Sequence, residues 1–264
     1  RYKIQSQKYK IISFTLPILF VSGIMLHGHY KFLNPVVQQI EVTVNKPVEG
    51  IDSLRIAVIG DLHLGWLINR NDAKRYVDLI MAQKPDLILF VGDIIDSHID
   101  PVLDQNMEKE LERLSAKYGV LSCTGNHEYR YDAEEKIQLL NESGITMLRD
   151  SAASINGTFY VVGREDFIIE NRKSIKELLN DQDVDMSKPV IVLNHTPNNL
   201  GEESNAGVDI ALYGHTHHGQ AFPGNILTEL VFEVAHGYNK KENTHVYVTS
   251  GIGLVGPQYR IGTV

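Results

Sequence analysis

The feature that most constrains the fold is that five predicted strands end in residue types that bind metal ions. The strands are apolar runs, and an Asp, Asn or His follows each of them within a few residues. They cover 54–59, 87–91, 120–123, 190–193 and 210–212, and the clusters that follow are Asp61-Leu62-His63, Gly92-Asp93-Ile94-Ile95-Asp96, Gly125-Asn126-His127-Glu128, Asn194-His195 and Gly214-His215-Thr216-His217-His218-Gly219. Open α/β sheets bind ligands beyond the carboxyl ends of their strands. We therefore expect these side chains to converge at one edge.

Helical segments alternate with the first strands. Asp72–Ala82 has the apolar period of a helix, Asp100 and Pro101 predict an N-cap and first position of a helix running to about Lys117, and Ala133–Ser143 predicts a third helix. This β-α-β-α order predicts an α/β fold with a largely parallel sheet covered by helices. Further strands at 159–162 and 246–249 make the second half strand-rich, which predicts a second sheet.

The residue types define the metal chemistry. Asp, Asn and His ligands without cysteine suit Mn, Fe, Zn or Ni, and the single Cys123 excludes both an internal disulfide and a cysteine-built site. In Asp61-x-His63 and in His215-x-His217 a spacing of two would put both side chains on one side of an extended turn. One carboxylate can bridge two metals, and Asp93 is the best candidate.

Other residues near these clusters have more ordinary interpretations. We expect Asp96 to orient a metal ligand rather than bind metal, and Glu128 and His218 to be structural. Gly251–Gly256 fits the G-x-G-x-x-G pattern, but Pro257 follows where a dinucleotide fold needs a helix, so we predict a tight loop bordering the site. His127 to Tyr131 resembles a zinc-protease motif with Tyr in place of the second His, and no G-x-S-x-G is present.

The N-terminal residues have the composition of a membrane anchor. From Ile11 to Tyr30 twenty residues carry no Asp, Glu, Lys or Arg, and about twenty helical residues cross a ~30 Å hydrocarbon core. A cleaved signal peptide and a buried globular helix are the alternatives. We therefore divide the chain into an anchor and linker, residues 1–40, and a body, residues 41–264. Gly262-Thr263-Val264 is expected to lie within a strand that continues beyond the chain.

The charge is divided unequally between these two parts. The formal net charge of −8 is the sum of +5 over residues 1–40 and −13 over the remainder. The basic N-terminal residues predict a cytoplasmic start and an extracytoplasmic body. An acidic body argues against a nucleic-acid-binding surface, but it is compatible with a phosphate substrate where bound cations supply positive charge.

Taken together, the motifs resemble those of the calcineurin-like metallophosphoesterases, over about Leu54 to Tyr259. The segment Gly214–Gln220 followed by Phe222-Pro223, together with the anchor and Asn34–Val37, resembles the bacterial membrane-anchored phosphodiesterases, a branch that includes UDP-2,3-diacylglucosamine pyrophosphatases. The resemblance implies a four-layer metallo-dependent phosphatase-like fold, in which two packed mixed sheets are flanked by helices, with an N-terminal apolar helix and two divalent metal ions.

Residue roles also follow from the resemblance. Metal one would be held by Asp61, His63 and His217, metal two by Asn126, His195 and His215, and Asp93 would bridge them. A metal-bridging hydroxide would attack a phosphodiester or pyrophosphate, and His127 would act as general acid rather than as a ligand. The anchor suggests a phospholipid or lipid-linked pyrophosphate substrate. The alternatives are a soluble-nucleotide phosphodiesterase, a metal hydrolase of other chemistry such as amide hydrolysis, and a non-catalytic metal-binding or scaffolding module. The sequence does not specify an oligomeric state.

Overall fold

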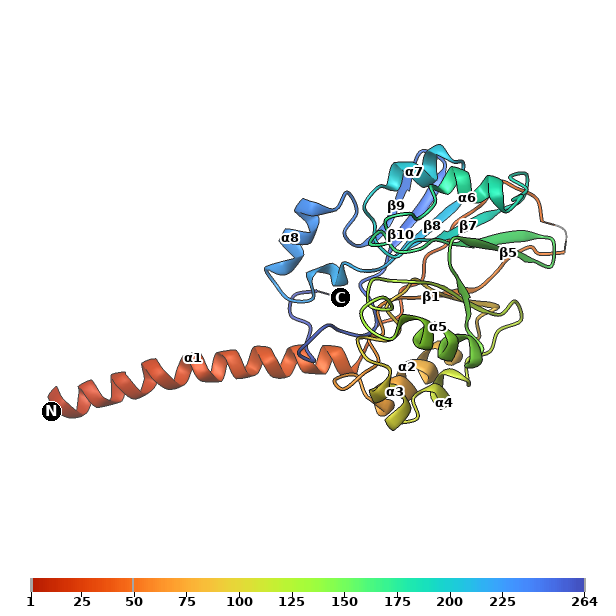
Figure 1. The fold of residues 1–264 in the computed structure, drawn as a ribbon. Helices are drawn as coiled ribbons and strands as arrows, with labels where there is room; N and C mark the ends of the chain where they lie inside the picture. Colours follow the sequence, from red (N-terminus) through yellow and green to blue (C-terminus); the bar gives the residue numbers. More distant parts are fainter. Residues whose placement is uncertain (1, 49, 264) are drawn as a thin grey trace.

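The computed structural model describes residues 2–48 and 50–263, which form a long N-terminal helix attached to a layered body (Figure 1). In chain order the elements are α1 (Tyr2–Leu33), β1 (Ile56–Ile59), α2 (Arg70–Ala82), β2 (Leu87–Phe90), α3 (Asp100–Asp104), α4 (Glu108–Leu111), β3 (Val120–Cys123), α5 (Ala133–Glu142), β4 (Thr146–Leu148), β5 (Ser151–Ile155), β6 (Phe159–Gly163), α6 (Ile175–Asp181), β7 (Val190–Leu193), α7 (Leu200–Asn205), β8 (Ile210–Tyr213), the 3₁₀ helix η1 (His217–Gly219), α8 (Gly224–Val231), β9 (Gly237–Lys241) and β10 (Thr244–Val248).

Over the described residues these strands form two sheets, as the sequence predicted. The first has the order β1-β2-β3-β4 and is parallel throughout. The second has the order β5-β6-β7-β8-β10-β9 and is parallel in its centre, with antiparallel pairs at both edges. The strands that precede predicted ligands are thus neighbours in parallel pairs, and their carboxyl ends lie at one edge.

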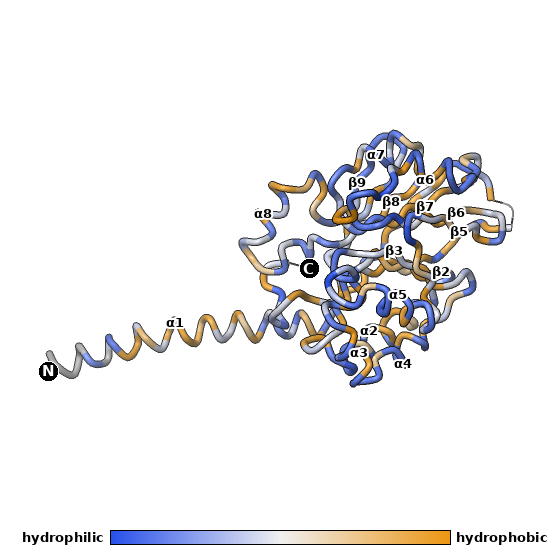
Figure 2. Tube along the Cα trace, viewed as in Figure 1, coloured by the Kyte–Doolittle hydropathy of each residue, from blue (hydrophilic) through white to orange (hydrophobic). Residues whose placement is uncertain are grey.

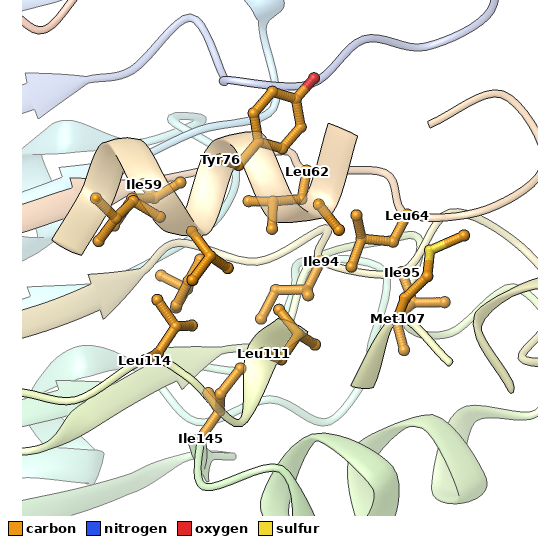
Figure 3. Close-up of a cluster of buried hydrophobic side chains, with 14 of the residues drawn as sticks. Ile59, Leu62, Leu64, Tyr76, Ile94, Ile95, Met107, Leu111, Leu114 and Ile145 are labelled. Atoms are coloured by element: carbon orange, nitrogen blue, oxygen red, sulfur yellow. The ribbon is translucent and has the colours of Figure 1, made fainter. Parts of the chain in front are cut away.

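Alternate side chains of each strand separate the layers. In β2, Leu87 and Leu89 belong to the core between the two sheets, whereas Ile88 and Phe90 belong to the core beneath the helices of the first sheet. This helix-side core includes residues from loops as well as helices, and Figure 3 shows Leu62, Leu64, Ile94 and Ile95 within it. Leu62 and Leu64, the residues after Asp61 and His63, anchor this ligand loop in the core.

The predicted helix from Asp100 to Lys117 is wrong in length and in its cap. The chain forms two short helices instead, and the N-cap of the first is Ile99, so Asp100 and Pro101 lie inside the first turn. Between the helices Asn106 adopts a left-handed φ of 51°, which reverses the backbone and allows Met107 to be fully buried. In a continuous helix Val102 and Met107, five positions apart, would point about 140° apart, whereas both lie in this core.

The expected strand at the end of the chain is also wrong over the described residues. Ile261 forms an isolated bridge with Ala221, and Gly262 then turns the backbone with a left-handed φ of 72°. Val264 lies outside the described residues.

The N-terminal helix α1 has two different parts. Along most of its length the described side chains are exposed and apolar, and Figure 2 shows this apolar stretch projecting from the body. Its last turns pack on the body, where Phe32 is buried in the helix-side core beneath the guanidinium of Arg75. Among the described residues α1 is the one helix long and apolar enough to cross a membrane.

The core between the sheets makes a testable contribution to stability. We expect Leu89→Ala to destabilise the chain by about 2–5 kcal/mol, because Leu89 is fully buried there and its removal leaves a cavity. The matched control is Leu103→Ala on α3, where the leucine is 46% exposed and the change is expected to stay within about 0.5 kcal/mol. Urea unfolding of the detergent-solubilised chain measures both, and equal midpoints for the two variants would contradict this packing.

Candidate metal centre

The loops after β1, β2, β3, β7 and β8 meet at the carboxyl edge of the two sheets, as predicted. Backbone hydrogen bonds connect neighbouring loops there. The amides of Asp61 and His63 donate to the carbonyls of Gly92 and Asp93, respectively, and the amide of Gly214 donates to the carbonyl of His195. All seven predicted metal ligands lie in this cluster of loops. Two groups of donors can be distinguished within it.

The first group consists of Asp61, His63 and His217, whose candidate ligand atoms all lie within 4.8 Å of one another. His217 Nε2 lies 3.0 Å from His63 Nε2 and 3.6 Å from Asp61 Oδ1. All three side chains are buried. Residues 154 positions apart in the sequence therefore direct three donor atoms toward one small volume.

The second group consists of Asp93, Asn126, His195 and His215. Asn126 Oδ1 lies 3.2 Å from His195 Nε2 and 3.0 Å from His215 Nδ1, and His195 Nε2 lies 3.1 Å from Asp93 Oδ2. The ring of His195 is held by its Nδ1, which lies 2.6 Å from the carbonyl oxygen of Val91, directly after β2 of the other sheet. That contact leaves Nε2 directed into the group.

One carboxylate oxygen lies between the two groups. Asp93 Oδ2 is 3.8 Å from His63 Nε2 of the first group and 3.1 Å from His195 Nε2 of the second. The other oxygen, Oδ1, accepts a hydrogen bond of 2.8 Å from the amide of His127. Asp93 is thus fixed by one oxygen and presents the other to both donor groups, which is the geometry of a bridging position.

His127 lies at the side of this shared oxygen. Its Nε2 is 3.9 Å from Asp93 Oδ2, and its Nδ1 is 2.8 Å from both the carbonyl oxygen and Oδ1 of Asp96. Asp96 Oδ1 also lies 3.3 Å from His63 Nδ1. Asp96 therefore orients two imidazoles, as the sequence predicted.

The expected extended backbone in the Asp-x-His and His-x-His pairs is wrong. Asp61, His63, His215 and His217 all have left-handed φ angles, of 57°, 51°, 70° and 48°. Such angles cost a non-glycine residue of the order of 1–3 kcal/mol each and persist when the surroundings enforce them. The side chains of each pair converge because successive left-handed turns redirect them, and the strand pleat has no part in it.

Two glycines of the motifs are required by close packing. A Cβ at Gly125 would overlap the Asp93 carboxylate, and one at Gly214 would lie 2.7 Å from Asp61 Oδ2. The amide of His215, next to Gly214, donates to Asp61 Oδ1 at 3.0 Å. The glycines therefore let the loops approach the carboxylates closely enough for the backbone to bind them.

Burial and neighbouring charges shift the pKa values of the donors in opposite directions. Burial lowers the pKa of His215, to about 4, and lowers that of His217 well below its usual range, with neighbouring imidazoles adding to both shifts. Burial also disfavours charge on His195, but Asp93 outweighs it and raises the pKa of His195 to about 10. Neutral His215 and His217 are in the metal-binding form at neutral pH, and the buried Asp93 carboxylate favours positive charge beside it.

The donor set fits divalent metal ions. The ligand atoms are imidazole nitrogens and carboxylate or amide oxygens without sulfur, a combination that binds Mn, Fe, Zn or Ni. The His217 Nδ1 is buried and has no hydrogen-bond partner among the described residues, so hydrogen bonding alone does not account for the buried position of this ring. Buried carboxylates without bound charge would be costly.

Sequence reasoning overlooked Asp166, which lies against the second donor group. It is fully buried, and its Oδ2 accepts a 3.0 Å hydrogen bond from Thr196 Oγ1, directly after His195. The signal that identified the ligands could have found it, because Asp166 follows the predicted strand at 159–162 just as Asp61 follows the first strand. The G-x-G-x-x-G loop borders the site as expected, since a Cβ at Gly251 would lie 2.7 Å from that of Asp61.

Comparisons with known proteins agree with this geometry. Residues 54–219 match the model of the calcineurin-like phosphoesterase family. A Helicobacter pylori protein described as an uncharacterized metallophosphoesterase is 29% identical over 93% of this chain and 65% of its own length. A zebrafish transmembrane protein with metallophosphoesterase domain is 30% identical over 87% of this chain and 55% of its own length. The chain thus spans less than two thirds of either relative.

Among solved structures, a Thermus thermophilus 5'-nucleotidase precursor superposes with a TM-score of 0.48 at 16% identity, over 76% of this chain and 49% of that one. The family match covers all five strand-end motifs, including His215 and His217. By this match and by its arrangement of metal-binding residues, the chain belongs to the calcineurin-like phosphoesterase family of metal-dependent phosphoric ester hydrolases.

Proposed function

We propose that this chain hydrolyses a phosphodiester or pyrophosphate bond at a membrane surface with the help of two divalent metal ions. The observation that carries the proposal is the position of Asp93 Oδ2 between the two donor groups. Asp61, His63 and His217 would hold one ion, Asn126, His195 and His215 the other, and Asp93 would contact both. When bound, two such ions would neutralise phosphoryl oxygens and activate water for attack on phosphorus.

His127 is suited to donate a proton to the leaving group. Its Nδ1 contacts Asp96 at 2.8 Å, which holds the ring by that nitrogen. Its Nε2 faces Asp93 Oδ2 at 3.9 Å, a distance longer than a hydrogen bond, so this nitrogen is available to a substrate oxygen. A general acid in this position typically contributes about 10²–10⁴-fold to the rate.

The arrangement of α1 supports a substrate at the membrane surface. The backbone amide of Arg260 donates to the carbonyl of Gly28 in α1 at 3.0 Å, and its guanidinium donates to the carbonyls of Gly251 and Gly253. Gly251 in turn packs on Asp61. A short, buried connection therefore holds the metal centre close to the point where α1 leaves the body.

An apolar helix and a relative named as a transmembrane protein suggest membrane association. We propose that residues 1–40 are the anchor and linker, that residues 41–264 are the catalytic part, and that the membrane is a bacterial inner membrane. The basic residues before the apolar stretch favour a cytoplasmic start and an extracytoplasmic body. A phospholipid or a lipid-linked pyrophosphate would be the natural substrate at that surface.

Asp93→Asn tests the shared carboxylate. We expect Mn²⁺ affinity to fall more than about 100-fold, because replacing a residue that only orients a ligand already lowers metal affinity about 10–100-fold. We also expect hydrolysis of bis-p-nitrophenyl phosphate to be nearly lost. The matched control is Asp104→Asn on the exposed face of α3, which should retain both. Calorimetric Mn²⁺ titration and the chelator-sensitive rate measure the effects, and full activity of Asp93→Asn would contradict the proposed site.

His127→Ala tests the general acid. We expect unchanged metal content and a rate loss of about 10²–10⁴-fold on a phosphodiester with an alkyl leaving group, with a much smaller loss on bis-p-nitrophenyl phosphate, whose leaving group needs no proton. His245→Ala is the control, since His245 lies near the start of β10, at the sheet edge opposite the metal centre. Equal losses on both substrates would indicate a structural role and remove His127 from proton transfer.

Glu128 is expected to position the ligand loops. Its carboxylate accepts hydrogen bonds of 2.8, 2.8, 3.2 and 2.7 Å from the amides of Asp93, Ile94, Ile95 and Gly125. Glu128→Gln places an amide group against these donors, so we expect Mn²⁺ affinity to fall about 10–100-fold and the metal-free melting temperature to drop. Glu135→Gln, at an exposed position, is the control. Retained affinity in Glu128→Gln would show that the loops hold their geometry without this carboxylate.

The substrate class is tested by comparing lipid and nucleotide phosphodiesters with the full chain in vesicles. We expect higher kcat/KM on the lipid substrates. A preference for soluble nucleotides, unaffected by lipid, would contradict the membrane-surface assignment and leave the metal centre in place.

A further inference from the structure

Helix α8 presents an apolar face that no described part of the chain covers. The spacing of Ile226, Leu227, Leu230 and Val231 places these four side chains on one side of the helix, and Leu230 and Val231 are 78% and 74% exposed. None of the residues of α8 is buried. The face therefore makes no contribution to the core, and a helix with such a face usually has a partner.

A second exposed apolar site occurs at a tight turn directly after the first metal-binding motif. Leu64 and Ile68 are fully buried and pair with each other, whereas Trp66 and Leu67 at the tip of the turn are 70% and 55% exposed. Burial of the flanking residues holds the tip outward. Trp66 is the one tryptophan of the chain, and tryptophan is enriched where proteins meet the membrane–water interface.

Both sites are connected to the last turns of α1 by the segment 255–261. On one side of this segment the Gln258 side chain donates to the carbonyl of Leu67, and the Gln258 carbonyl lies 2.8 Å from His29 Nδ1 of α1. On the other side the Ile261 carbonyl accepts from the amide of Phe222, two residues before α8. Figure 1 shows α8 on the side of the body from which α1 projects. The two apolar sites thus flank the exit of α1.

We propose that Trp66, Leu67, Ile226, Leu227, Leu230 and Val231 form a membrane-contacting collar around α1, which inserts into the interfacial region of the bilayer that α1 enters. The inference rests on the membrane attachment in the proposed function and adds a second contact to it. A bilayer is the favoured occupant because the collar lies beside the one helix of the described chain that is long and apolar enough to span it. Apolar helix faces bury about 5–10 Å into the headgroup and acyl boundary.

Charges on α8 are compatible with this contact. The carboxylate of Glu229 lies 3.4 Å from His218 Nε2, and that of Glu233, just after the helix, pairs with Lys241 at 2.7 Å. Since neither acid depends on a lipid for a partner, the collar should bind a zwitterionic surface through its apolar side chains.

The collar would also determine where substrate enters. Helix α8 follows η1, which contains the metal-ligand candidate His217, and Phe232 at its end lies against the ring of His215 at 6.1 Å between ring centroids. An inserted α8 would hold these two imidazoles near the headgroup layer. A phosphoester carried on a lipid would then reach the metal centre without leaving the membrane.

The single tryptophan allows a direct test in the full chain, reconstituted in phosphatidylcholine vesicles. We expect phosphatidylcholine brominated near the headgroup end of its acyl chains to reduce Trp66 emission by about half, since the contact is interfacial, and lipid brominated near the terminal methyl to reduce it less. The variant Trp66→Phe with Leu230→Trp reports on α8 and should behave alike. The control is Trp66→Phe with Ser154→Trp, an exposed position on β5 at the far edge of the body (Figure 1), and it should not be quenched.

The outcomes separate this inference from the proposed function. If the protein floats with the vesicles but Trp66 and Leu230→Trp are quenched no more than Ser154→Trp, α1 attaches the chain and the collar proposal is wrong. If both reporters are shielded from aqueous acrylamide but not quenched by brominated lipid, a protein covers the face, which also overturns the proposal. If the chain does not float, membrane attachment itself fails, while chelator-sensitive hydrolysis of bis-p-nitrophenyl phosphate still tests the metal centre.

Discussion

The buried carboxylates of Asp61 and Asp93 are the constraint on which the rest of the structure depends. Both lie at the carboxyl edge of two apolar sheets, and the negative charge of Asp93 adds to burial in raising the pKa of Asp61. Two like charges in such a place need hydrogen bonds and positive charge close by. Backbone amides from neighbouring loops supply the first, and the surrounding imidazoles together with bound cations would supply the second. The glycines, the left-handed turns and the buried Glu128 are what bring these groups within reach.

Much of the fold and of the site could be predicted, because buried strands are apolar runs in the sequence and their ends are followed by polar residues. A run such as Leu87–Phe90 is apolar at every position because the two faces of β2 pack in different cores. Parallel pairing of β1 with β2 places Asp61 beside Asp93, and packing of the second sheet on the first brings His195 to them, although 134 positions separate the first from the last. The ligand residue types and the sheet topology both indicate the same edge. The motifs taken together therefore predicted the site, although no single motif would have done so.

The remainder depends on tertiary contacts that local patterns do not encode. The pattern at Asp100–Lys117 is helical, but burial of Met107 breaks it at Asn106. The left-handed angles of His63 and His215 are enforced by packing of neighbouring loops, so a spacing of two residues could not reveal them. Exposure of Trp66 and Leu230 is likewise invisible in the sequence, where an apolar residue predicts burial. Asp166 is different. We treat polar residues directly after a predicted strand as candidate site residues, and this rule was not applied to the strand at 159–162.

The most direct test of the central claim is anomalous diffraction from crystals of the chain grown with Mn²⁺. Two anomalous peaks about 3.5–4 Å apart, one beside His63 and His217, the other beside His195 and His215, with Asp93 Oδ2 between them, are the result this account predicts. A single peak elsewhere, or two peaks that Asp93 does not contact, would contradict it.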